Sequence, residues 1–188
     1  MASVLLITID TLRADHLEAY GYPRKTGPNL ARLAKEATLF EYAFAPISYT
    51  VPSLTSMMTG LWPSWHTAGF SNMPRKELGP EAAPLAEMAS DAGYSTAAFV
   101  STVVLSGLNC GLSQGFQVYD DRTERSELNR PAFLYRRGQE TERAASEWLK
   151  VNGREPFFLW LHFMDVHGPY CPPPPHDRRF ATDTRAPW

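Results

Sequence analysis

Three carboxylate and imidazole side chains follow directly after apolar runs of this sequence. Asp10 ends the run LLITI, and Asp165 and His167 follow the run PFFLWLHFM. Carboxylate oxygens and imidazole nitrogens are common ligands of divalent cations. A cation held there would lower the pKa of a neighbouring hydroxyl and neutralise an anionic ester. Nucleophilic attack on a phosphate or sulfate ester requires both effects.

The uncharged segment 46–60, PISYTVPSLTSMMTG, supplies candidate hydroxyls. Its serine and threonine residues surround Pro52, at a point where a helix is expected to begin. Two interpretations are open for Thr50: it is the N-cap of that helix or a nucleophile. On spacing alone, capping is the better interpretation.

The other polar residues also have structural interpretations. Asp10 suits a turn after a strand, and His167 suits a loop histidine bonded to the backbone. His66 suits an aromatic ring packed at the surface. Composition and spacing therefore indicate an anion or metal site and leave these alternatives open.

The hydrophobic pattern predicts the elements that must position these residues. Apolar runs predict strands at 4–9, 94–101 and 156–164, and an aromatic-rich run predicts an extended segment at 38–44. Amphipathic spacing predicts helices at 28–37, 52–60, 84–92 and 137–151. The continuous apolar character of 4–9 is typical of a strand buried on both faces. Segment 102–135 indicates only loops and short turns.

Strands that alternate with helices predict an α/β fold, with a mostly parallel sheet flanked by helices on both faces. Ligands of such sheets bind beyond the carboxyl ends of the strands. We therefore expect Asp10, Asp165 and His167 to lie at one rim of the sheet, with the Thr50 region beside them.

Size and composition suit one globular domain, with 188 residues of which 44% are apolar. A formal net charge of −2 gives no electrostatic reason to expect nucleic acid or an anionic membrane as a partner. No apolar segment is long enough to span a bilayer, and the N-terminus lacks the basic leader of a secretory signal. A cytoplasmic location is expected. Cys110 and Cys171 show neither a disulfide framework nor metal-ligand spacing.

Several motifs, in order, resemble the sulfatase-like family of the alkaline phosphatase superfamily. They are TLRADHL after the first strand, YGY, GPNLARLA, PLAEMASDAGYSTAAFVS, GFQVYDD and PFFLWLHFMDVHGPYCPP. The resemblance covers essentially the whole chain. It implies that residues 1–188 form the N-terminal domain of a sulfatase-like fold, incomplete at the C-terminus. The family's later metal ligands, an Asp-His or Asp-Asn pair, have no counterpart after residue 167, which implies a truncated chain or a fragment of a longer catalytic domain.

The resemblance also implies a catalytic core. Thr50 occupies the position of the family's nucleophilic cysteine, at the head of TVPSL, and Asp10 matches the first metal ligand. Asp10 and Thr50 are thus the expected ligands of a divalent metal, which is Ca, Zn or Mn. His167 matches a catalytic histidine that contacts the transferred group or the leaving oxygen.

Further residues are assigned by the same resemblance. Asn72 and His66 are expected to bind substrate. Arg13 and Asp15 belong to the opening signature, and we expect them to be an ion pair with a structural role.

The threonine at the nucleophile position decides the expected chemistry. Threonine cannot become the formylglycine of the sulfatases, and Leu54 replaces the arginine that supports that nucleophile. We expect a metal-dependent hydrolase of phosphate or sulfate esters, with phosphoesters favoured and Thr50 forming a covalent intermediate. The ester belongs to a small molecule, a glycan or a lipid. The alternatives are a catalytically silent domain that keeps the anion pocket, and a phospho-group transferase.

Overall fold

The structure is a computed structural model of the chain, and it describes residues 1–69, 77–123, 125–127, 130–168 and 170–180. The chain divides into two compact units, one of Met1–Asp10 with Pro46–Trp188 and one of Thr11–Ala45. The interpretation of residues 1–188 as a single domain stays a prediction.

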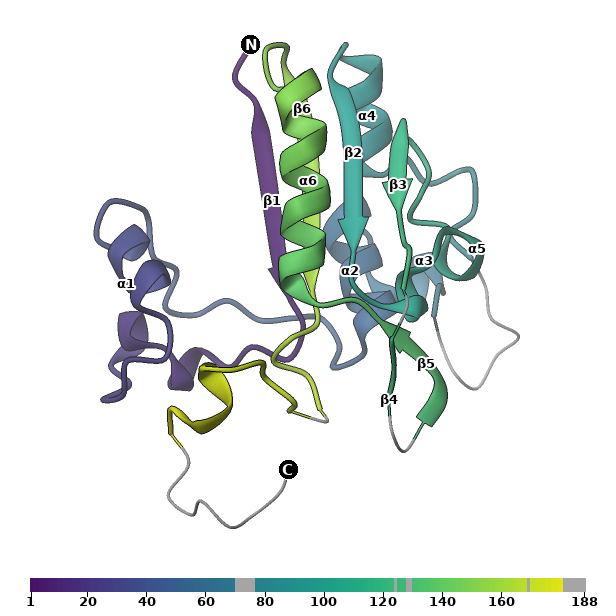
Figure 1. The fold of residues 1–188 in the computed structure, drawn as a ribbon. Helices are drawn as coiled ribbons and strands as arrows, with labels where there is room; N and C mark the ends of the chain where they lie inside the picture. Colours follow the sequence, from purple (N-terminus) through teal and green to yellow (C-terminus); the bar gives the residue numbers. More distant parts are fainter. Residues whose placement is uncertain (70–76, 124, 128–129, 169, 181–188) are drawn as a thin grey trace. The chain divides into compact units, whose positions relative to one another are not determined.

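Four parallel strands form the main sheet of the larger unit, in the order β1-β6-β2-β3. They are β1 Val4–Ile9, β2 Ser95–Val100, β3 Val118–Asp120 and β6 Phe157–Phe163 (Figure 1). The predicted α/β class with a parallel sheet is confirmed. Three of the four strands lie where the apolar runs predicted them.

Helices cover both faces of this sheet, as predicted. They are α2 Thr50–Thr59, α4 Leu85–Asp91 and α6 Gly138–Asn152. Because side chains alternate along a strand, β2 and β6 supply two separate cores. Ala98 and Trp160 pack with α2 and α4, whereas Ala97 and Leu159 pack with α6. Figure 1 shows α6 along the front of the sheet and α2 and α4 behind it.

Short elements make up the rest of the larger unit. They are α3 Pro63–His66, η3 Val103–Leu105, α5 Gly107–Cys110, η4 His176–Arg178, and the antiparallel strands β4 Arg125–Glu127 and β5 Arg130–Tyr135. Most fall in segment 102–135, where the sequence indicated short turns. The strands β3 to β5 in that segment were not predicted.

The smaller unit contains only short helices within the described residues. They are η1 Ala14–His16, η2 Glu18–Tyr20 and α1 Pro28–Ala34. Arg13 and Asp15 form the expected ion pair, with 2.7 Å between Nη2 and Oδ2. The helix predicted at 28–37 ends at Ala34, earlier than expected.

Three expectations about local burial and structure are wrong. Strand β1 is not buried on both faces: Ile7 is 50% exposed, because α6 packs over β6 and β2 and the core beneath it includes no β1 residue. Residues 38–44 form no strand within the described chain, since no other segment there pairs with them. The spacing of residues 52–60 predicts that Met57 faces inward with Leu54 and Met58; Met57 is instead 49% exposed, because the buried stripe of α2 passes through Leu54 and Met58.

No helix in the described part of the chain combines the length and the apolar character needed to cross a membrane. Within the same residues no disulfide is present, and Cys171 is exposed.

Candidate functional site

Thr50 and Asp10 meet at the carboxyl end of β1. Thr50 is the first residue of α2, and the N-cap position belongs to Tyr49. The Thr50 hydroxyl Oγ1 donates a hydrogen bond of 2.8 Å to Oδ2 of Asp10. The N-cap interpretation of Thr50 is therefore wrong, and a carboxylate holds the hydroxyl instead.

Local structure explains why these two residues meet. The Asp10 N–H donates to the Phe163 carbonyl over 2.9 Å, which extends the β1–β6 pairing to the carboxylate. Leu54 and Met58 anchor α2 on the sheet through its buried stripe. Pro52 suits the first helical turn, where its missing N–H costs no hydrogen bond. The amino end of α2 is thereby fixed at the end of β1.

A polar cluster inside the sheet stands behind Asp10. Thr8 of β1 and His162 of β6 are register partners, and 2.8 Å separates Thr8 Oγ1 from His162 Nδ1. The Trp160 indole Nε1–H donates to Thr8 Oγ1 over 3.0 Å. The other ring nitrogen of His162, Nε2, lies 3.7 Å from Asp10 Oδ2.

The His162 side chain is 1% exposed, and its Nε2 has no hydrogen-bond partner among the described residues. Such a buried polar group costs about 1–3 kcal/mol. Burial lowers the pKa of His162 to about 4, against the opposing effect of the Asp10 charge, so the ring is neutral at neutral pH. The sequence pattern does not single out His162; its signal is one ionisable side chain within the apolar run PFFLWLHFM.

His66 connects α3 to α2. The Ala68 N–H donates to His66 Nδ1 over 3.0 Å, so Nε2 carries the proton and donates to Ser56 Oγ, also over 3.0 Å. Burial lowers the pKa of His66, which keeps the ring neutral. None of its described hydrogen bonds reaches Thr50 or Asp10, and its substrate-binding role stays a prediction.

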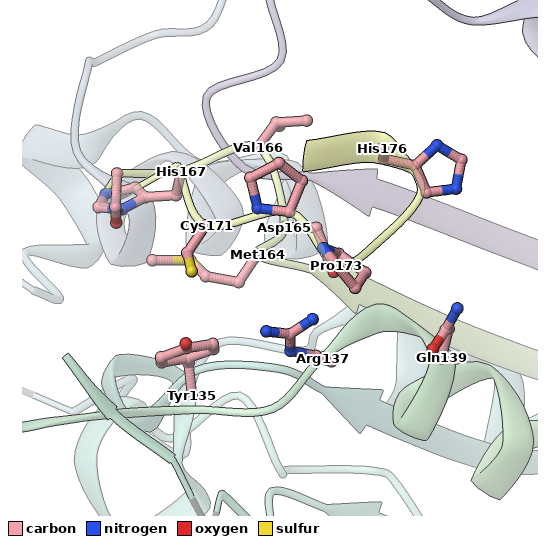
Figure 2. A pocket seen from close by; sticks show the side chains of 12 residues that line it. Tyr135, Arg137, Gln139, Met164, Asp165, Val166, His167, Cys171, Pro173 and His176 are labelled. Atoms are coloured by element: carbon pink, nitrogen blue, oxygen red, sulfur yellow. Dashed lines mark hydrogen bonds between the residues drawn. The ribbon is translucent and has the colours of Figure 1, made fainter. Parts of the chain in front are cut away.

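Residues after β6 and at the start of α6 enclose a cavity of about 290 Å³. Figure 2 shows His167, Cys171 and His176 on one side of this cavity, with Arg137 opposite them. His167 Nδ1 donates to the Gly168 carbonyl over 2.7 Å, as a loop histidine would.

Asp165 lines the same cavity and has a structural partner. Its Oδ1 accepts the N–H of Gly138 over 3.1 Å, which ties the first turn of α6 to the segment after β6. Asp10 and Thr50 are not among the residues that line this cavity. The structure thus joins Thr50 to Asp10. Asp165 and His167 line the cavity after β6, the strand next to β1, so Asp10 and Asp165 follow the carboxyl ends of neighbouring strands as expected. Asn72 lies outside the described residues.

Asp10 and Thr50 fit part of a divalent-cation shell. Their oxygens are hard donors 2.8 Å apart, and the Asp10 side chain is only 9% exposed. Within the described residues no Arg or Lys pairs with Asp10, so the charge of a nearly buried carboxylate is not balanced. Those residues include no group of three or more His, Cys, Asp or Glu side chains that could hold a metal. Asp10 and Thr50 thus provide two of the ligands that a divalent cation would need.

Comparisons with known proteins identify the class of the fold. The structure is similar to the phosphonate monoester hydrolase of Agrobacterium radiobacter, with a TM-score of 0.69 and 22% identity over 95% of this chain and 44% of that one. It is also similar to the C-terminal periplasmic domain of EcEptC from Escherichia coli, solved in complex with Zn, with a TM-score of 0.66 and 18% identity over 99% and 50% of the two chains. The chain therefore has the fold of these two proteins.

The sequence identifies the family within that class. The family described as Sulfatase matches residues 2–187. Arylsulfatase A of Bos taurus is 32% identical over 97 residues, which are 50% of this chain and 19% of that protein. The chain belongs to the sulfatase family, which confirms the resemblance seen in its motifs. It spans half or less of the length of each of these relatives.

Proposed function

We propose that this chain carries the nucleophile of a metal-dependent ester hydrolase, with Thr50 as the nucleophile and phosphate esters preferred over sulfate esters. The observation that carries the proposal is the 2.8 Å hydrogen bond from Thr50 Oγ1 to Asp10 Oδ2. A carboxylate that accepts the proton of a hydroxyl orients that oxygen and increases its nucleophilicity.

Thr50, Asp10 and the amino end of α2 have different roles in the proposed reaction. Thr50 Oγ1 bonds to phosphorus while the bond from phosphorus to the leaving oxygen breaks. The hydroxyl proton passes through Asp10 to water, and the leaving alkoxide takes a proton from water. Water then cleaves the phospho-threonine ester, releases phosphate and restores Thr50. No side chain caps α2, so the positive end of its dipole faces the charge on the transferred group.

A divalent cation at Asp10 and Thr50 would supply charge neutralisation and a lower hydroxyl pKa. The Zn of the EcEptC domain supports Zn among the three candidates Ca, Zn and Mn. His167 is proposed to contact the transferred group or the leaving oxygen. A small-molecule, glycan or lipid ester is the proposed substrate.

The choice of phosphate rests on the side chain at position 50. The sulfatase resemblance implies a formylglycine made from cysteine, and threonine has no thiol to oxidise. The name of the phosphonate monoester hydrolase shows that this fold also serves phosphorus esters. A sulfate ester is the second candidate, because arylsulfatase A is a relative by sequence.

The test is hydrolysis of p-nitrophenyl phosphate, bis-p-nitrophenyl phosphate and p-nitrophenyl sulfate by the chain with Zn, Mn or Ca. Metal-dependent turnover should be fastest with a phosphoester, and acid-quenched samples should carry phosphate on Thr50 by mass spectrometry. Thr50→Val keeps the shape without the hydroxyl and should lower turnover at least about 100-fold, since it removes a covalent route. Ser53→Ala, which changes another hydroxyl in the first turn of the same helix, is the matched control and should stay active.

Other outcomes distinguish the alternatives. Equal turnover by Thr50→Val, or faster cleavage of the sulfate, would contradict the proposal. Release of p-nitrophenol with the phosphate passed to added glycerol would favour a transferase. An unlabelled Thr50 with no turnover under any metal would favour a catalytically silent domain.

A further inference from the structure

The imidazole of His162 is buried beside the candidate site and has one nitrogen without a partner. Its Nε2 forms no hydrogen bond among the described residues and lies 3.7 Å from Asp10 Oδ2. That same oxygen accepts the Thr50 hydroxyl over 2.8 Å. Buried polar groups in proteins are nearly always bonded, so an unpartnered one at a candidate site requires an explanation.

The hydrogen bonds around Thr8 favour one position of the ring proton. The Trp160 indole can only donate, and it donates to Thr8 Oγ1 over 3.0 Å. The Thr8 hydroxyl proton then has two acceptors, His162 Nδ1 at 2.8 Å and the Leu161 carbonyl at 3.4 Å. The shorter contact is the better hydrogen bond, so Nδ1 accepts and Nε2 of the neutral ring carries the proton.

We propose that His162 is a positioning residue that turns its Nε2–H toward Asp10 Oδ2 and thereby holds this carboxylate facing Thr50. The proposal rests on the proposed function in that Asp10 and Thr50 are the working pair. The contact must shorten by about 0.5 Å to reach a normal N–H···O distance, and such bonds often tighten only in the working complex. A neutral donor orients Asp10 without cancelling the charge that a cation needs.

The first test determines the tautomer. Spectra of nitrogen-labelled histidine in the full chain, assigned through His162→Gln, should show a proton on Nε2 and none on Nδ1. Thr8→Val removes the hydroxyl and should increase the Nδ1-protonated form, whereas Thr8→Ser keeps the hydroxyl and should match the wild type. In Asp10→Asn the Hε2 resonance should shift, since the charged acceptor is lost. A proton on Nδ1, or an Hε2 resonance unchanged by Asp10→Asn, would overturn the proposal.

The second test compares two amides at position 162 by calorimetric titration with Mn²⁺. His162→Gln puts an N–H near the place of Nε2 and should bind the ion within about threefold of the wild type. His162→Asn reaches only the place of Nδ1 and should bind at least about tenfold more weakly, as for other partners of metal ligands. Equal affinity of the two variants would overturn the proposal.

These experiments distinguish a failure of this proposal from a failure of the proposed function. If Thr50 is not the nucleophile, phosphate labelling of Thr50 fails while the tautomer and the Gln–Asn difference persist. If His162 does not position Asp10, the tautomer is reversed or the two amides behave alike, whatever the labelling shows. If neither amide variant folds, the comparison of Thr8→Val with Thr8→Ser decides by the tautomer alone.

Discussion

At the scale of single residues, one oxygen atom is central. Asp10 Oδ2 accepts the Thr50 hydroxyl at 2.8 Å and faces His162 Nε2 at 3.7 Å. Both neighbours are neutral and Asp10 is nearly buried, so neither of them balances the charge of the carboxylate. That charge is the property that a cation would use, and it can be removed without changing the shape of the side chain.

Asp10→Asn removes the negative charge of the Asp10 side chain and keeps its shape. The amide oxygen still accepts the Thr50 hydroxyl, but the attraction for a cation is lost. We expect Mn²⁺ affinity to fall at least tenfold, which is about 1.4 kcal/mol. Calorimetry on the folded variant measures this, with Ser53→Ala as the control that keeps both expected ligands, Asp10 and Thr50. Unchanged affinity in Asp10→Asn would instead support a silent fold.

Ser56→Ala tests whether His66 is structural. It removes the Ser56 hydroxyl that accepts from His66 Nε2–H and leaves the ring its backbone hydrogen bond to Pro52, so we expect the free energy of unfolding to fall by about 0.5–1.5 kcal/mol. Urea denaturation measures the loss, and Ser53→Ala in the same helix serves as control. A raised KM at unchanged stability would point to the substrate-binding role that the sequence suggested for His66.

At the scale of elements, a buried ion pair joins two strands and a helix. Arg136 Nη1 donates to Asp120 Oδ1 of β3 over 2.9 Å, and its Nη2 donates to the Val100 carbonyl of β2 over 3.1 Å. Its Nε donates to Thr141 Oγ1 of α6 over 3.1 Å. The side chains of Arg136 and Asp120 are 8% and 6% exposed. One guanidinium therefore fixes how α6 lies on the sheet.

Arg136→Met should lower the free energy of unfolding by about 1–3 kcal/mol, because it leaves the buried Asp120 carboxylate with only the exposed Arg122 as its charged partner. Urea denaturation at neutral pH measures this. Lys150→Met, which breaks an exposed pair with Glu147, is the control and should cost less than about 1 kcal/mol. Equal losses in the two variants would contradict the role given to Arg136.

Acid should weaken the ion pairs of Asp120 with Arg122 and Arg136. Burial alone would raise the pKa of Asp120, but hydrogen bonding to Arg122 and the charge of Arg136 outweigh burial and hold the pKa below its usual 3.8. The stabilisation is therefore complete above that usual value and is lost as pH falls through the lowered one. Denaturation curves between neutral pH and pH about 2 should show a decline that Asp120→Asn lacks. Parallel curves for the two proteins would contradict this assignment.

Gly115 shows how closely the elements approach. It has φ +82°, and a Cβ there would collide with the backbone nitrogen of Glu87 in α4. Gly115→Ala should cost about 2–5 kcal/mol, combining about 1–2 for the left-handed backbone and about 1–3 for overpacking. Gly93→Ala, at φ +83° with no atom within 4 Å, should cost only the first part. Thermal denaturation of both variants compares them, and equal costs would contradict the packing argument.

The elements differ in how far the sequence predicts them. Apolar runs and helical spacing located β1, β2, β6 and α6, because periodicity is their main signal. The short strand β3 carries too few residues to show a period, and residues 38–44 have strand-like composition but no partner strand. The meeting of Thr50 with Asp10 was expected from the rule on strand ends. His162 was missed because pattern analysis reads an apolar run as core and passes over the one polar residue in it.

At the scale of the whole molecule, the division into two units is the main feature. The candidate site residues that the structure describes all belong to the larger unit. The segment 38–45 ends the smaller unit without a helix or strand, and its Phe40, Tyr42 and Phe44 are largely exposed. The cytoplasmic location and the lack of a nucleic-acid partner stay predictions.

Chymotrypsin should therefore cut native protein after Phe40, Tyr42 or Phe44 before it cuts after Phe158 or Trp160 in β6. Exposed backbone without regular hydrogen bonds fits a protease cleft, whereas buried strand residues require unfolding first. Mass spectrometry of a brief digest checks the order. Equally early cuts within β6 would mean that the larger unit opens as readily as segment 38–45.

The side chains of β6 alternate between the two faces of the sheet, and this limits the kinds of genetic change that the protein tolerates. Trp160 and His162 face α2, and Leu159 and Leu161 face α6. Inserting or deleting one codon in this strand exchanges the two sets, so that His162 enters the apolar core beneath α6 and leaves Asp10. In a mutational scan, β6 should accept many single apolar substitutions yet lose function with every one-residue insertion or deletion, although Thr50 and Asp10 themselves remain intact.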